Sequence, residues 1–119
     1  MATSHINTIY EVDTDRKETA MLNATIKERT SNITIEVKTA LEKMEQACEI
    51  WEHKCDEAYC EVVTCEDLIL FYDTPEVAKR LARAYNRNRH YDYIYHKIVD
   101  KCEALEEALN GLEKALYWL

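Results

Sequence analysis

The six residues "YDTPEV", at positions 72–77, decide how this chain folds. Pro75 is the single proline among 119 residues, and Gly111 is the single glycine. Proline suits the first position of a helix and pushes the residue before it out of the helical conformation. Asp73 or Thr74 can therefore cap a helix that begins at Pro75, and the preceding helix must end just before this cap. The sequence predicts two long helices joined by a short turn.

Apolar residues recur at alternating steps of four and three on both sides of this turn. Such a heptad pattern, sustained over five or more heptads, is typical of coiled-coil packing. It predicts an all-α fold whose main part is an antiparallel two-helix coiled-coil hairpin, with helices over about 33–72 and 75–118. Asn88 is the one polar residue in the downstream pattern, where it would set register or oligomeric state. The positions of this seam are Val37, Leu41, Met44, Cys48, Trp51, Cys55, Ala58, Val62, Cys65, Ile69 and Tyr72 upstream, and Val77, Leu81, Ala84, Asn88, Tyr91, Tyr95, Ile98, Cys102, Leu105, Leu109, Leu112, Leu116 and Leu119 downstream.

Antiparallel pairing places residues at equal distances from the turn opposite each other. Cys65 then faces Ala84, and Cys48 faces Cys102. The chain has five cysteines, an odd number without an export signal, so we expect free thiols. Cysteine in such a seam is usually a small buried hydrophobic residue. A disulfide or redox role for Cys48 and Cys102 is the less favoured alternative.

A shorter third helix is predicted upstream of the hairpin, over about residues 15–29. Asp15 followed by Glu18 has the spacing of a capping box, and Met21 lies on a weak apolar face. The segment "TSNIT" at 30–34 is expected to break or kink the chain. Small residues flanking the seam leave a shelf that this helix would fill, either in the same chain or in another copy. The expectation is a three-helix bundle or an oligomeric helical bundle, a single domain over residues 1–119, with residues 1–12 as a flexible arm.

Composition narrows the classes of function. The net charge is −8, so we expect a soluble protein that repels nucleic acid at long range. Charges interrupt every apolar run, and the N-terminus lacks a signal peptide, which predicts a cytoplasmic protein with no membrane contact. With one glycine and one proline, a catalytic site built on loops is not expected.

Charge is segregated between the two long helices. Residues 42–76 carry eleven acidic residues and two lysines, whereas residues 77–101 carry seven Lys or Arg and two Asp. The favoured interpretation is that the basic helix complements the acidic one and fixes their register. The alternative is that the basic and aromatic stripe over 80–101 binds nucleic acid, a nucleotide or a partner. The residues of this basic stripe are Arg80, Arg83, Arg87, His90, Tyr93, Lys97 and Lys101.

An acidic stripe over 42–56 of the first long helix is the other candidate site. Paired carboxylates on facing helices can hold Mg²⁺, as in all-α nucleotide pyrophosphohydrolases. The more ordinary interpretation is a solvated acidic face. The possible metal ligands are Glu45, Glu49, Glu52, Asp56 and, on the facing helix, Glu106. No other residues suggest catalysis, and no cofactor is expected.

By elimination, the sequence predicts a non-enzymatic interaction protein: an adaptor, an assembly chaperone or a small inhibitor. Such a compact acidic chain would suit an accessory protein of a phage or mobile element. The expected partner is another protein, a second copy of the chain, or both, with a symmetric dimer as the default. Tyr117 and Trp118 lie off the seam and would be exposed in a monomer, so they are the candidate oligomer interface.

Overall fold

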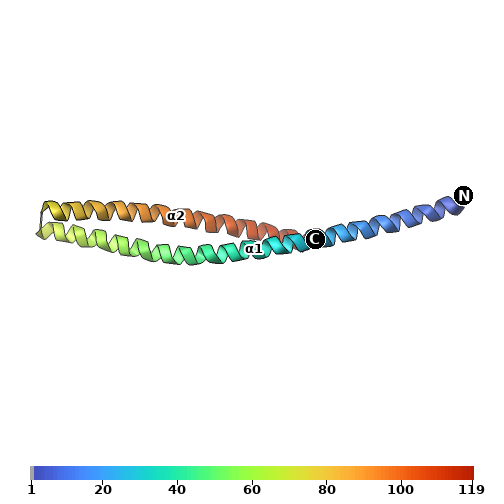
Figure 1. Ribbon diagram of the computed structural model, residues 1–119, viewed down its shortest axis with the longest axis horizontal. Helices are drawn as coiled ribbons and strands as arrows, with labels where there is room; N and C mark the ends of the chain where they lie inside the picture. Colours follow the sequence, from blue (N-terminus) through green and yellow to red (C-terminus); the bar gives the residue numbers. More distant parts are fainter. Residues whose placement is uncertain (1) are drawn as a thin grey trace. The chain divides into compact units, whose positions relative to one another are not determined.

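The structure, a computed structural model, describes the backbone of residues 2–119 and the side chains of residues 15–119. It contains two helices, α1 (Ala2–Phe71) and α2 (Pro75–Trp118), and no strand among the described residues (Figure 1). The prediction of an all-α fold is confirmed. Neither helix, over the residues described, includes a stretch that is long and apolar enough to cross a membrane.

The turn between the helices forms as "YDTPEV" predicts. Of the two candidate caps, Thr74 is the one used: its Oγ1 accepts a hydrogen bond of 3.3 Å from the backbone N–H of Val77, and its carbonyl accepts one of 3.1 Å from the N–H of Ala78. This is the bonding pattern of an N-cap residue, and Pro75 occupies the first helical position behind it. The turn closes with a 2.9 Å hydrogen bond from the Thr74 N–H to the carbonyl of Tyr72.

α1 is one continuous helix, so the separate helix expected at about 15–29 is wrong. Residues 30–34 contain neither proline nor glycine, and Thr, Ser, Asn and Ile each cost a helix only a few tenths of a kcal/mol relative to its best residues. Two threonine hydroxyls also find acceptors within the helix. Thr30 Oγ1 donates to the carbonyl of Ile26 at 2.8 Å, and Thr34 Oγ1 donates to the carbonyl of Thr30 at 2.7 Å. The chain therefore does not turn back at this point.

Two further expectations depended on that break. Asp15 does not cap a helix, because it lies inside α1. The structure also does not show a three-helix bundle, since it has only two helices over the residues described. The flexible arm expected at residues 1–12 lies in the part of α1 whose side chains are not described, and it stays a prediction.

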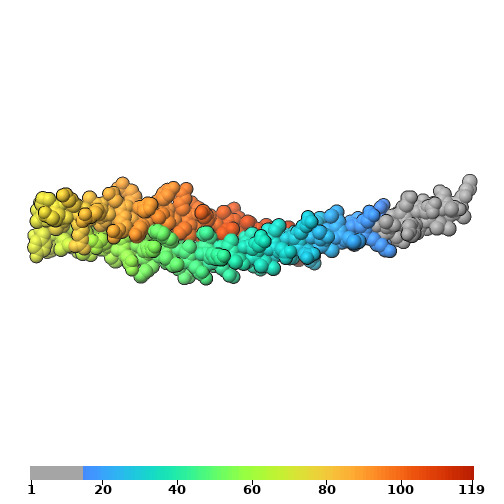
Figure 2. All heavy atoms as spheres, in the orientation of Figure 1, coloured from blue at the N-terminus to red at the C-terminus, as the bar shows by residue number. Residues whose placement is uncertain are grey.

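The chain divides into two compact units. One, the hairpin unit, is Thr39–Glu107; the other, the terminal unit, combines Met1–Lys38 with Ala108–Leu119. In the hairpin unit, α1 and α2 run antiparallel on either side of the turn (Figure 1). Figure 2 shows the side chains of the two helices filling the space between them in this unit.

The hairpin unit is held by the predicted seam. Every seam position from Leu41 to Leu105 is buried or half-buried, except Tyr72 beside the turn, which is 62% exposed. The best buried part is a cluster of Val62, Cys65 and Ala84. The predicted pairing of Cys65 with Ala84 is therefore confirmed, and burying such a cluster is the main stabilising contribution that a helix pair of this kind has.

In the terminal unit, the last turns of α2 lie beside α1. Lys38 Nζ is 3.7 Å from Glu113 Oε1, and Thr34 is 5% exposed although it is polar. Upstream of these contacts the environment changes: every side chain from residue 15 to residue 29 is exposed. α1 thus continues for several turns in the terminal unit without a helix packed against it (Figure 1).

Candidate functional site

The structure gathers only part of the predicted basic stripe. Arg80, Arg83 and Arg87 line one surface pocket of the hairpin unit together with Ala84 and the carboxylate of Glu61 from α1. Glu61 and Arg87 also line an adjoining pocket, whose other lining residues are Lys54, Glu57, Ala58 and Tyr91. Three arginine side chains therefore line one pocket, to which α1 contributes a single acidic side chain. We refer to Glu61, Arg80, Arg83, Ala84 and Arg87 as the arginine pocket.

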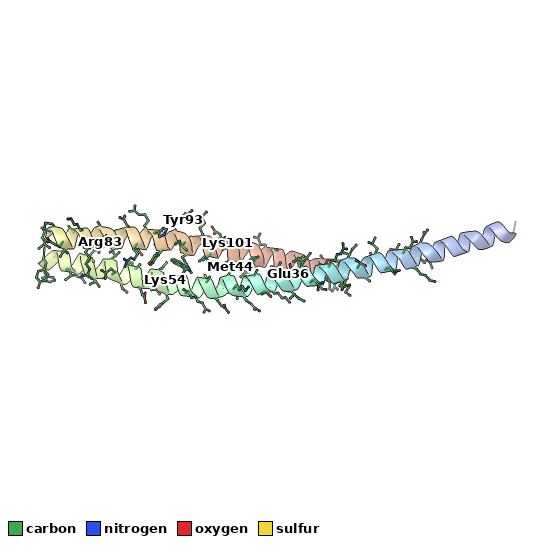
Figure 3. The ribbon with its side chains drawn as sticks, in the orientation of Figure 1. Glu36, Met44, Lys54, Arg83, Tyr93 and Lys101 are labelled. Atoms are coloured by element: carbon green, nitrogen blue, oxygen red, sulfur yellow. The ribbon has the colours of Figure 1, made fainter. Side chains whose placement is uncertain are left out.

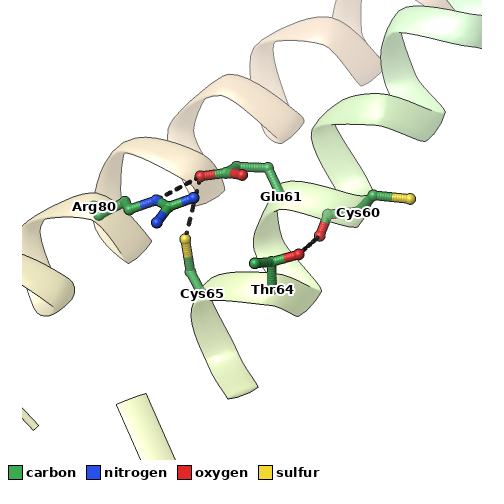
Figure 4. Close-up of polar contacts among 5 residues, drawn as sticks. All are labelled: Cys60, Glu61, Thr64, Cys65 and Arg80. Carbon is green, nitrogen blue, oxygen red and sulfur yellow. Dashed lines mark hydrogen bonds and ion pairs between the residues drawn. The ribbon is translucent and has the colours of Figure 1, made fainter. Parts of the chain in front are cut away.

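Glu61 accepts two hydrogen bonds at the arginine pocket, from Arg80 and from Cys65 (Figure 4). Arg80 Nε donates to Glu61 Oε1 at 2.8 Å, and Cys65 Sγ donates to the same oxygen at 3.4 Å. The hydrogen bond from Arg80 lowers the pKa of Glu61, and the same bond raises the pKa of Arg80. Burial, followed by the bond to Glu61, raises the pKa of the Cys65 thiol, which therefore stays protonated and donates. The pocket is anchored to the buried cluster through Cys65.

The direct ion pair of Glu61 is with Arg80, and not with Arg87, which lies two turns further along α2 and lines the same pocket. A second bond across the hairpin was not predicted at all: Tyr85 Oη donates to Glu66 Oε1 at 2.6 Å, which raises the pKa of Tyr85. Long side chains reach a turn up or down the facing helix, so the position opposite in register need not be the bonded one. The sequence signal for such bonds is the presence of opposite charges at nearby positions of the two facing helices.

The remaining residues of the basic stripe do not join the arginine pocket. Lys97 Nζ lies 5.4 Å from the ring centre of Tyr93, and the His90 ring is tilted against Tyr91 at 6.4 Å. In Figure 3, Arg83, Tyr93 and Lys101 are spread along α2. Three arginines of the basic stripe thus line the pocket, and the other four residues of the stripe are exposed separately along α2.

The acidic stripe remains a row of exposed carboxylates. Among the side chains of residues 15–119, no three or more His, Cys, Asp and Glu form a group that could hold a metal ion. The predicted ligands are all exposed: Glu45, Glu49, Glu52 and Asp56 on α1, and Glu106 on α2. The Mg²⁺ site and the hydrolase activity based on it stay predictions that this geometry does not strengthen.

The five cysteines are free, as expected. Burial raises the pKa of Cys102, with a further contribution from the neighbouring Cys48. Burial, together with a hydrogen bond and charge from Asp92, likewise raises the pKa of Cys55. A raised pKa leaves less thiolate at neutral pH, and the thiolate is the nucleophilic form. These seam thiols are therefore poor nucleophiles.

The two most exposed large apolar side chains among the described residues lie in the terminal unit. Tyr117 and Trp118, the predicted oligomer interface, are 82% and 84% exposed, and their rings meet edge to face at 5.5 Å. Sequence reasoning expected the apolar side chains of residues 15–29 to pack as a third helix, and so missed them as a surface. Among the described side chains, the large exposed apolar residues of α1 in this unit are Met21, Leu22, Ile26, Ile33 and Ile35.

Comparison of the chain with protein-family models, with curated proteins and with solved structures found no match. Two surfaces of the molecule bear on its function. One is the exposed apolar surface of the terminal unit, and the other is the arginine pocket of the hairpin unit.

Proposed function

We propose that this chain is a non-enzymatic helical interaction protein that associates through residues 15–33 of α1, with a second copy of the chain as its partner. The observation that carries the proposal is a run of helix whose side chains are all exposed from residue 15 to residue 29 although several are apolar. Helices in proteins owe most of their stability to packing of an apolar face against a neighbour. In this segment the neighbour has to come from outside the described residues.

The apolar side chains form a stripe with regular spacing. Leu22, Ile26 and Ile33 are separated by steps of four and seven, which places them on one face of the helix. They are 60%, 39% and 48% exposed. We refer to these three residues as the leucine–isoleucine stripe. A heptad-spaced face of this kind favours pairing with another helix in the manner of a coiled coil.

Charge on the same face favours a second copy as the partner. Asp15 lies seven residues before Leu22 and Arg29 lies seven residues after it. When two copies of α1 pair antiparallel about Leu22, Asp15 of each copy meets Arg29 of the other. A two-fold axis generates both ion pairs from one sequence, as an isologous interface requires. The pairing would complete the oligomeric helical bundle expected from the sequence.

The predicted strength of this association is modest. In this register Leu22 of each copy meets Leu22 of the other, whereas Ile26 meets Glu18. Each partly exposed apolar side chain that is buried contributes up to about 1.5 kcal/mol, which offsets only part of the cost of association. Tyr117 and Trp118 add apolar surface in the same unit, and we propose them as a second contact of the assembly. A reversible dimer that dissociates on dilution is the expected species.

The test is light scattering on a size-exclusion column, in reducing buffer over a range of protein concentrations. We expect the mass to rise from one chain toward two with concentration, and Leu22→Glu to hold it at one. Met21→Glu is the matched control, because Met21 is 71% exposed but lies about 100° around the helix from Leu22. A wild-type chain that is monomeric at every concentration would refute self-association. Equal loss of the dimer in the Met21→Glu variant would refute the leucine–isoleucine stripe as its contact.

A further inference from the structure

We infer that the arginine pocket binds a compact phosphate group of the pyrophosphate type, carried by a small molecule. This goes beyond the proposed association and involves the other unit of the chain. The pocket lies wholly in the hairpin unit and takes its cations from one face of α2, at positions 80, 83 and 87.

The charges in the pocket are unbalanced toward positive. Glu61 is its only acidic lining residue, against three guanidinium groups. Arg80 uses its Nε on Glu61, while neither Arg83 nor Arg87 forms an ion pair with any carboxylate whose side chain is described. Guanidinium groups bind phosphate oxygens through pairs of parallel N–H donors, which makes them the preferred side chains for such anions. Arg83 and Arg87 therefore have no direct bond to a described carboxylate, although the charge of Arg87 helps to lower the pKa of Glu61, and Glu61 holds Arg80 in place.

The geometry of the pocket suits a short polyphosphate. Arg80 and Arg87 are two turns apart, about 10 Å along the axis of α2, with Arg83 between them. Ala84, which is 4% exposed and belongs to the buried cluster with Val62 and Cys65, lines the pocket between the arginines. Its small side chain leaves room for an anion to approach, and its packing keeps the floor rigid.

The surrounding charge selects for a small ligand and against a long nucleic acid. The chain carries a net charge of −8, and the adjoining pocket balances Glu57 and Glu61 against Lys54 and Arg87, so it offers no net positive charge. A polyanion that extends past the arginines therefore gains little from this neighbouring pocket. A compact anion interacts mainly with the cations that touch it, because solvent ions screen charges beyond about 10 Å.

The experiment is calorimetric titration of the full chain, at about 0.1 M ionic strength, with inorganic pyrophosphate, followed by adenosine diphosphate and adenosine. We expect pyrophosphate and adenosine diphosphate to bind and adenosine not to bind. Arg83→Gln and Arg87→Gln should each weaken binding about tenfold, the usual loss for one charge-assisted hydrogen bond. Arg89→Gln is the matched control, because Arg89 is exposed on α2 but does not line the pocket, and it should leave the affinity unchanged.

Glu61→Gln separates a binding site from a purely structural ion pair. Removing the competing carboxylate frees the Arg80 guanidinium, so pyrophosphate should bind more tightly to this variant. The same titration with the Leu22→Glu variant should give wild-type affinity, which keeps this inference distinguishable from the proposed self-association.

Three outcomes would overturn the inference: no binding of pyrophosphate by the wild-type chain, an equal loss in Arg89→Gln, or tighter binding of a single-stranded oligonucleotide than of pyrophosphate. The last would identify an extended nucleic-acid surface instead. Circular dichroism of each variant checks that the helices are intact, and a shift of the Arg80 Nε–H resonance in the wild-type chain gives a readout that needs no substitution.

Discussion

The hairpin unit and residues 15–29 of the terminal unit are equally helical but differ in what packs against them. In the hairpin unit, apolar side chains at the seam positions are buried between α1 and α2. Upstream of Val37, the same three-and-four spacing along α1 reaches Thr34, Thr30, Lys27 and Asn23, which are polar. The apolar residues there lie instead on the leucine–isoleucine stripe, on a neighbouring face. Forming a helix and choosing its partner are therefore separate properties of a sequence.

The largest expected effect on stability comes from a substitution in the buried cluster of the hairpin unit. Val62→Asp places a carboxylate in the cluster with Cys65 and Ala84, where Val62 is 4% exposed. Burying an unpaired charge costs several kcal/mol, so we expect a loss of about 3–5 kcal/mol in the free energy of unfolding. Thermal and urea unfolding followed by circular dichroism measures it.

The adjacent residue provides the control for that substitution. Val63→Asp introduces the same carboxylate at a side chain that is 38% exposed. We expect it to cost less than about 1 kcal/mol, because the charge can reach water. Similar losses for the two variants would mean that the buried cluster does not dominate the stability of the hairpin unit.

The proposed antiparallel pairing of residues 15–29 can be tested by exchanging charges in the terminal unit. Asp15→Arg would bring arginine against Arg29 twice in the proposed antiparallel dimer, whereas Asp15→Arg combined with Arg29→Asp would restore both ion pairs. Exposed pairs are worth up to about 1 kcal/mol each, so the single variant should weaken the dimer about tenfold and the double variant should recover it. Sedimentation equilibrium gives the dissociation constants.

Glu28→Arg is the matched control for this exchange, because it changes charge by the same amount on the far side of the helix from Leu22. If the double variant stays as weak as Asp15→Arg, the antiparallel register about Leu22 is wrong, even if the chain still associates by another face.

Much of this fold follows from the sequence because its signals are local or periodic. Pro75 and Thr74 set the turn through backbone geometry, and heptad spacing determines which side chains enter the seam of the hairpin unit. The continuity of α1 through residues 30–34 differs from the break predicted there, because weak helix formers without a proline or glycine do not end a helix.

The candidate site was predictable only in part. Periodicity placed Arg80, Arg83 and Arg87 on one face of α2, but not the reach of each side chain, so the bond from Arg80 to Glu61 was not foreseen. The exposure of Leu22 was missed for a different reason. An apolar stripe indicates that a helix needs a partner, and it does not indicate whether that partner is in the same chain.

A smaller effect is expected from pH, through Glu61. The hydrogen bond from Arg80 lowers the pKa of Glu61 in the folded chain below its value in the unfolded chain. The stabilisation is therefore fully present above the ordinary glutamate pKa of about 4.3 and is lost as the pH falls through the lowered value. Because the pair is partly exposed to solvent, the loss of stability should be small.

The measurement is the melting temperature from neutral to acidic pH for the wild-type chain and Glu61→Gln. The wild-type chain should lose more stability on acidification, so the two melting temperatures should converge below about pH 4. Glu42→Gln, an exposed carboxylate that forms no ion pair with a described side chain, should run parallel to the wild type. A constant gap between the wild type and Glu61→Gln would show that Glu61 does not contribute through its charge.

The smallest effect is expected at Thr34, in the terminal unit where the seam becomes polar. Its hydroxyl donates to the Thr30 carbonyl within α1, so Thr34→Val removes this donor without leaving a buried polar group unpaired. We expect a change of less than about 1 kcal/mol, neutral or stabilising, in thermal unfolding. Thr64→Val is the control, since Thr64 makes the same bond to the Cys60 carbonyl at an exposed position. A marked loss at Thr34 alone would mean that its hydroxyl stabilises the terminal unit. A gain in stability would mean that the polar residues upstream of Val37 are not required for stability. Their role would then be to determine which helix packs against α1.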